Sequence, residues 1–130
     1  MFMRHSPEIA RIIQPCEQGP PEVRQHERRR DPRYPFRVTQ MVAFHCEEAT
    51  PTKDMLQPVR CHDISLGGIS FFLAGPPKNE HCTLLLGRPP GLLFVKARVV
   101  HSEPTESSPD TWIIGCEFVE KLEEFPLREI

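Results

Sequence analysis

Arginine is concentrated in one short stretch of this chain, HERRRDPRYPFR at residues 26–37, which holds five arginines in twelve positions. The whole chain has a formal net charge of -2 at pH 7, so this positive charge is local. A guanidinium group bonds bidentately to phosphate oxygens or to guanine O6 and N7, and it also stacks on purine faces. The stretch therefore predicts a segment that binds an anion or a nucleotide, with a solvated basic arm or a nonspecific phosphate-binding tail as alternatives.

A second polar group follows in DISLGG, residues 63–68. The carboxylate of Asp63 can accept hydrogen bonds from the N1–H and N2–H₂ edge of guanine, an edge that adenine lacks. Ser65 supplies a hydroxyl for a phosphate or a base, and Gly68 lets the backbone approach a ligand closely. The structural alternative is an Asx-turn from Asp63 to Ser65 with a β-bulge at the two glycines.

Together the two stretches resemble the signature of the PilZ domain family, R-x-x-x-R followed by [D/N]-x-S-x-x-G. The first motif falls on Arg29 and Arg33, and the second on residues 63–68. The resemblance extends to the sequence RYPF after the second arginine and to a late G-x-x-F at residues 115–118, and it covers about residues 26–120. Each motif alone is weak, but both in this order are specific.

The resemblance implies a six-stranded antiparallel β-barrel that acts as a noncatalytic receptor for cyclic di-GMP, without a cofactor. An unidentified protein partner would read the bound state, and no specific nucleic acid is implied. An arginine just before R-x-x-x-R favours two stacked ligand molecules over one. The alternative is a PilZ-fold interaction module that binds no nucleotide. The implied ligand-binding residues are Arg28, Arg29, Arg33, Asp63, Ser65 and Gly68.

In this interpretation the arginines lie on a flexible segment that folds over the ligand, and residues 63–68 end a strand on the outer surface of the barrel. Ligand would order residues 28–33 against the barrel, which is a common way for a binding event to switch a surface. Arg33→Ala should then weaken binding and leave thermal stability nearly unchanged.

The hydrophobic pattern also favours an all-β fold. Apolar residues alternate along residues 36–45, 93–99 and 112–118, and ISFFL and CTLLLG are short apolar runs bounded by turn residues. The chain contains 15 prolines, so long helices are not expected. About six short strands without intervening helices predict an antiparallel barrel or sandwich, and a barrel leaves no exposed edges.

Outside the predicted barrel, residues 24–122, the chain has two short extensions. Residues 1–23 form an arm in which Ser6–Gln14 could make a short helix, capped by Ser6 and followed by a proline-rich linker. Residues 123–130 form a tail, and the amphipathic sequence from Glu120 onwards could give a helical turn before Pro126.

Cysteine and histidine allow a competing hypothesis, a metal site, because they are adjacent at residues 45–46, 61–62 and 81–82. Neighbouring residues on a strand point to opposite faces, and no C-x₂₋₄-C pair is present, so buried core cysteines are the better interpretation. Five widely spaced cysteines, no signal peptide and no apolar run long enough to span a bilayer favour a cytoplasmic protein without membrane insertion.

Overall fold

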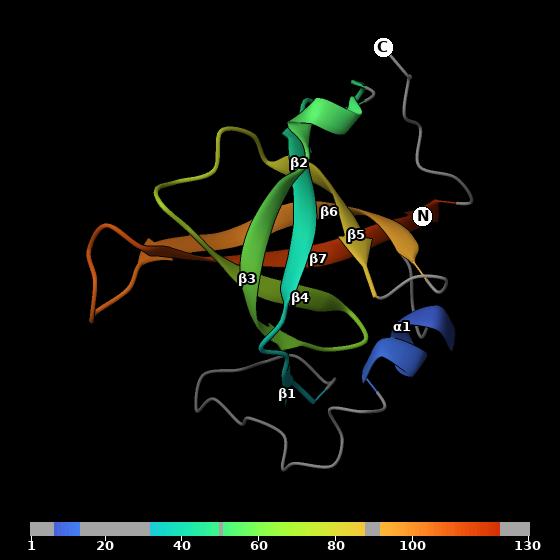
Figure 1. Cartoon of the computed structure of the whole chain (residues 1–130), viewed down its shortest axis with the longest axis horizontal. Coiled ribbons are helices and arrows are strands. Elements are labelled where there is room, and N and C mark those ends of the chain that lie inside the picture. Colours follow the sequence, from blue (N-terminus) through green and yellow to red (C-terminus); the bar gives the residue numbers. More distant parts are fainter. Residues whose placement is uncertain (1–6, 14–31, 50, 88–91, 123–130) are drawn as a thin grey trace.

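The computed structural model describes residues 7–13, 32–49, 51–87 and 92–122. Figure 1 shows strands wrapped into one barrel, with a short helix beside it. The elements are α1 (Pro7–Ile13), β1 (Tyr34–Pro35), β2 (Thr39–His45), the 3₁₀ helix η2 (Lys53–Met55), β3 (Gln57–Ile64), β4 (Gly68–Leu73), β5 (His81–Leu86), β6 (Leu93–Pro104) and β7 (Trp112–Leu122).

The strands close into a ring of antiparallel pairs. They follow the order β3, β2, β5, β6, β7, β4, and β4 pairs back onto β3. The first half of β3 pairs with β2, whereas its second half pairs with β4 and with the two-residue β1. The predicted six-stranded antiparallel barrel is confirmed, and β1 is an addition that the hydrophobic pattern did not indicate.

Alternate side chains of the strands fill the barrel. Ile114, Cys116 and Phe118 of β7 point inward, as the period of two predicted, and none is more than 2% exposed. Phe44 of β2 and Phe71 of β4 meet in the core with ring centroids 6.2 Å apart. Each buried side chain of this size contributes about 1.5–3 kcal/mol, so the core formed by strands distant in sequence stabilises the closed barrel.

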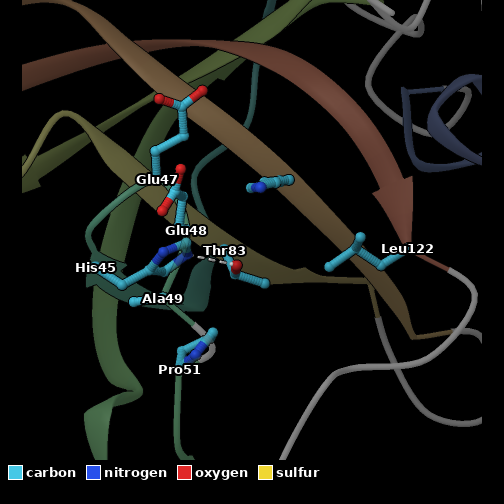
Figure 2. A pocket seen from close by; sticks show the side chains of 8 residues that line it. His45, Glu47, Glu48, Ala49, Pro51, Thr83 and Leu122 are labelled. Atoms are coloured by element: carbon cyan, nitrogen blue, oxygen red, sulfur yellow. Dashed lines mark hydrogen bonds between the residues drawn. The ribbon is translucent and has the colours of Figure 1, made fainter.

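Strand β2 departs from the predicted alternation, because residues 42–45 are all buried. His45 belongs to the outer face, and Figure 2 shows it at the wall of a pocket of about 450 Å³ beneath the loop that follows the strand. Its Nδ1–H donates to the Cys46 carbonyl at 2.7 Å, and in the neutral ring Nε2 then accepts from the Thr83 hydroxyl at 2.8 Å. The loop therefore covers a face that the sequence pattern left open.

Helix α1 lies within the predicted Ser6–Gln14 and packs against the barrel core through Ile9 and Ile13, which are at most 1% exposed. Glu8 Oε1 and Lys121 Nζ lie 2.9 Å apart and join the helix to β7. Seven residues are too few for a stable isolated helix, so packing against the barrel supports it. The predicted Ser6 cap, the linker and the boundary at residue 23 lie outside the described residues.

Strand β7 continues to Leu122. Glu120, Lys121 and Leu122, where the amphipathic tail sequence begins, belong to this strand, and Lys96 and Phe94 of β6 pair with Glu120 and Leu122. Residues 123–130 lie outside the described residues, so the helical turn expected before Pro126 stays a prediction. None of the described helices has the length and apolar character required to cross a membrane.

Candidate functional site

An ion pair joins the two sequence motifs. The guanidinium Nη1 of Arg33 donates to Oδ1 of Asp63 at 2.5 Å, although the residues lie thirty positions apart. The antiparallel pairing of β1 with β3 sets this contact, because Pro35 lies opposite Asp63 and Arg33 comes two residues earlier. The side chains are 5% and 0% exposed. The two motifs lie together, and Arg33, which was expected on a flexible segment, is buried against the barrel.

Ser70 of β4 is part of the same cluster, and sequence reasoning missed it. Its hydroxyl donates to Asp63 Oδ1 at 2.7 Å, and the Asp63 backbone N–H reaches the same hydroxyl at 3.3 Å. Asp63 and Ser70 lie opposite each other, next to a register shift between Cys61 and Asp63. The only signal in the sequence was one polar residue inside the apolar run ISFFL.

Ser65 and Gly68 meet in the tight turn between β3 and β4. The Ser65 hydroxyl accepts hydrogen bonds from the backbone N–H of Gly67 at 3.2 Å and of Gly68 at 3.1 Å. The Ser65 N–H donates to the Gly68 carbonyl at 2.8 Å, which closes the turn. The alternative Asx-turn from Asp63 is wrong, because Ser65 itself supplies the turn oxygen, and the bulge lies before Asp63 instead of at the glycines.

Three further side chains form a second group, on β3, β4 and the segment before β2. Arg37 Nη1 donates to Nδ1 of His62 at 2.5 Å. The His62 ring meets Phe72 of β4 edge-on, with centroids 5.4 Å apart and an interplanar angle of 66°. This combination of a cation with two rings is chemically suited to stacking and to bonding a base. Sequence reasoning had considered His62 only as a metal ligand.

Arg28 and Arg29 lie outside the described residues, so the structure reports no position for either. Of the remaining predicted site residues, it brings Arg33 into contact with Asp63, and Ser65 into contact with Gly68. Both contacts lie where β3 turns into β4, and all four residues are buried.

The metal hypothesis gains no support from the described residues, among which no three histidine, cysteine or acidic side chains form a group able to hold an ion. Cys61, Cys82 and Cys116 are free thiols in the core. Burial raises the pKa of Cys61 to about 12. The pKa of Cys82 lies well above its usual value. The largest cause is the hydrogen bond with Cys116, and the second is burial. The prediction that cysteines occupy the core holds for these three, whereas Cys46 is exposed.

Comparisons with solved structures found matches at low sequence identity. Bacillus subtilis inhibitor of motility, MotI (DgrA), matches with a TM-score of 0.50 and 19% identity, over 80% of this chain and 49% of that one. The K. pneumoniae MrkH–c-di-GMP complex matches at 0.48 and 22%, over 71% and 44%. MrkH, described as a c-di-GMP-dependent transcription regulatory factor, matches at 0.47 and 22%, over 70% and 43%.

The chain thus spans less than half the length of these three proteins. A search of curated protein sequences found no match. The model of the PilZ domain family matches residues 27–129, which include both motifs and every strand of the barrel. The chain therefore belongs to the PilZ domain family.

Proposed function

We propose that this chain is a noncatalytic receptor for cyclic di-GMP in the bacterial cytoplasm. Residues 24–122 would form the receptor domain, with residues 1–23 as an arm and 123–130 as a tail. Ligand would bind outside the barrel, where β3 turns into β4, without a cofactor. The proposed ligand-binding residues are Arg28, Arg29, Arg33, Asp63, Ser65 and Gly68.

The observation that carries this proposal is the contact between the two family motifs. Arg33 Nη1 and Asp63 Oδ1 lie 2.5 Å apart, and the match to the PilZ family model includes both residues. A guanidinium and a carboxylate side by side offer a donor for phosphate or for guanine O6 and N7, and an acceptor for guanine N1–H and N2–H₂. Adenine lacks that paired donor edge, so the arrangement favours guanine.

Ligand binding would rearrange the Arg33–Asp63 contact, because both side chains are buried in contact with each other. We propose that Arg33 turns toward the nucleotide while Ser70 keeps its hydrogen bond to Oδ1 of Asp63, 2.7 Å long. The contact between guanidinium and carboxylate would be exchanged for contacts of each group with the ligand. Such an exchange limits affinity, since only the difference between the two sets of contacts stabilises the complex.

The output would be a protein partner that reads the altered surface. Cyclic di-GMP would order the arginine-rich segment, residues 28–33, against the barrel. Arg28 would contribute a further cation able to stack and to bond, which favours two stacked ligand molecules.

Calorimetric titration of the purified chain with cyclic di-GMP tests this function, with cyclic di-AMP and GTP as controls. We expect saturable binding of cyclic di-GMP at micromolar ligand and none of the controls under the same conditions. A folded chain that binds none of the three would instead be a PilZ interaction module. Binding of all three that weakens steeply with salt would indicate a nonspecific phosphate site.

A further inference from the structure

The β6–β7 hairpin extends past the rest of the barrel and leaves part of β6 with one neighbour. Figure 1 shows the hairpin (orange) reaching beyond the other strands. Strand β5 pairs with β6 only as far as Arg98, and a final hydrogen bond joins the Val99 N–H to the Glu80 carbonyl at 2.7 Å. Among the described residues, 101–104 then pair with β7 alone, and Val100 lies at a register shift between Val99 and His101. Their other side is an open strand edge, with backbone groups able to pair with another chain.

A groove runs beside this edge. The loop between β4 and β5 forms one side, and residues 99–102 of β6 form the other, around a volume of about 380 Å³. Val100 lies in the groove and is 43% exposed, which makes it one of the three exposed large apolar side chains among the described residues. The loop residues that line the groove are Pro76, Pro77, Lys78, Asn79 and Glu80.

The charge along the hairpin is acidic. No lysine or arginine occurs from residue 99 to residue 120, whereas Glu103, Glu106 and Asp110 lie near the hairpin end and are exposed. His101 Nε2 lies 3.1 Å from Glu103 Oε1, so these two side chains share one face of β6. Lys78 and Glu80 on the loop side carry opposite charges. A basic chain is therefore favoured toward the end of the hairpin.

We propose that this groove binds an extended, basic peptide segment of a partner protein, which adds a strand to the open edge of β6. Main-chain hydrogen bonds to residues 100–104 would hold the segment, and Val100 would contact its apolar side chains. Lysine or arginine side chains of the segment would lie near Glu103 and Glu106. This surface goes beyond the proposed function, and only its role in relaying cyclic di-GMP rests on that function.

The position of the groove suits a relay. Asp63 lies opposite Ser70, Ser70 opposite Gly115, and Gly115 opposite His101, which lines the groove. The row thus crosses from β3 over β4 and β7 to β6. Gly115 leaves little room in it, since a Cβ built there would lie 3.4 Å from the Cβ of His101. A shift of β4 at the proposed nucleotide site that displaced β7 would also displace His101 at the open edge, because Ser70 pairs with Gly115 and Gly115 pairs with His101.

Fluorescence anisotropy with a labelled peptide tests the proposal. The probe alternates valine with lysine over about eight residues, long enough to span a strand of ordinary length. One control peptide carries methyl groups on alternate backbone nitrogens, and a second has glutamate in place of lysine. We expect the unmodified peptide to bind saturably, and methylation on the bonding edge to weaken binding about tenfold or more, because it removes several hydrogen bonds. The glutamate peptide should not bind.

Two charge reversals locate the site. Glu103→Lys should lower peptide affinity about five- to tenfold, whereas Glu47→Lys, at an exposed carboxylate in the loop after β2, should leave it unchanged. No binding of the lysine peptide, equal binding of the methylated and unmodified peptides, or equal effects of the two reversals would each overturn the proposal. Calorimetry of the wild-type chain with cyclic di-GMP separates the two claims, because a chain that binds cyclic di-GMP but not the lysine peptide contradicts only the groove.

Discussion

At the scale of single residues, the Arg33–Asp63 pair has a structural as well as a binding role. Moving two charges out of water is unfavourable, and their attraction offsets this only while both are present. Both side chains are at most 5% exposed, so each depends on the other. The sequence-based expectation that Arg33→Ala would leave stability unchanged is therefore replaced by the opposite expectation.

Arg33→Ala should lower the free energy of unfolding by about 3–5 kcal/mol, because it leaves the buried carboxylate of Asp63 without its cation. Urea denaturation measures this loss. Arg60→Ala, at an exposed arginine of β3, is the matched control and should cost less than about 0.5 kcal/mol. The double variant Arg33→Ala/Asp63→Ala should lose clearly less than the sum of the single losses. Additive losses would show that the pair is not coupled.

Arg28 supplies a prediction about stoichiometry that rests on the family resemblance. We expect two cyclic di-GMP molecules per chain for the wild type and a shift toward one for Arg28→Leu, with the first binding event largely kept. An apolar side chain neither stacks on a guanine as a cation nor bonds a second phosphate. Calorimetry measures the ratio of ligand to chain. A wild-type value near one would contradict this role of Arg28 and leave the proposed receptor function unaffected.

At the scale of elements, the turn from β3 to β4 depends on one hydroxyl. Ser65→Ala removes an acceptor shared by the backbone N–H groups of Gly67 and Gly68 and should cost about 1–3 kcal/mol of stability. Thermal unfolding measures the loss. Ser107→Ala, at an exposed serine of the β6–β7 loop, is the control and should have almost no effect. Equal melting temperatures of the two variants would show that the Ser65 hydroxyl does not stabilise the turn.

The hydrophobic pattern predicted some features of the strands and missed others. The inward faces of β6 and β7 were predictable, because a period of two places Val95, Ala97, Ile114 and Cys116 on one side, and the structure buries all four. Strand β1 was not predictable, because two residues are too few to show an alternation of apolar and polar side chains. The outer face of β2 was also missed, because its covering comes from a loop and not from the strand itself.

The candidate site was predictable in its residues and not in its contacts. Arg33 and Asp63 were found through a motif, but their burial follows from the pairing of β1 with β3, which the sequence does not display. Ser70 was not predicted as a site residue, because its contact with Asp63 depends on the register between β3 and β4 after the shift at residues 61–63. A one-residue difference in register would have turned its side chain to the opposite face.

At the scale of the whole molecule, the core thiols link stability to pH. The Cys61 thiol has a pKa of about 12 in the folded chain against 9.0 for an ordinary thiol. Between these values the unfolded chain releases the proton and the folded chain keeps it, so stability falls as pH rises, by up to about 1.4 kcal/mol per pH unit. Below pH 9 the thiol is protonated in both states and contributes no slope.

Cys61→Ala should therefore flatten the decline in stability between pH 9 and 12 relative to the wild type. Urea denaturation at a series of pH values measures both slopes. Lysine and tyrosine titrate in the same range, but they are common to both proteins, so the difference belongs to the thiol. Equal slopes of stability against pH in the two proteins would mean that the pKa of Cys61 is the same in the folded and unfolded chain.

The central claim, that cyclic di-GMP binds where the two motifs meet, is tested most directly by a nuclear magnetic resonance titration of the ¹⁵N-labelled chain. The account predicts saturable shifts of the Gly67 and Gly68 amides and of the Arg33 Nε–H with cyclic di-GMP, and none with cyclic di-AMP. Arg33 belongs to the contact with Asp63, and the two amides belong to the turn that follows it. Unchanged signals at these three groups, or equal shifts with both nucleotides, would contradict it.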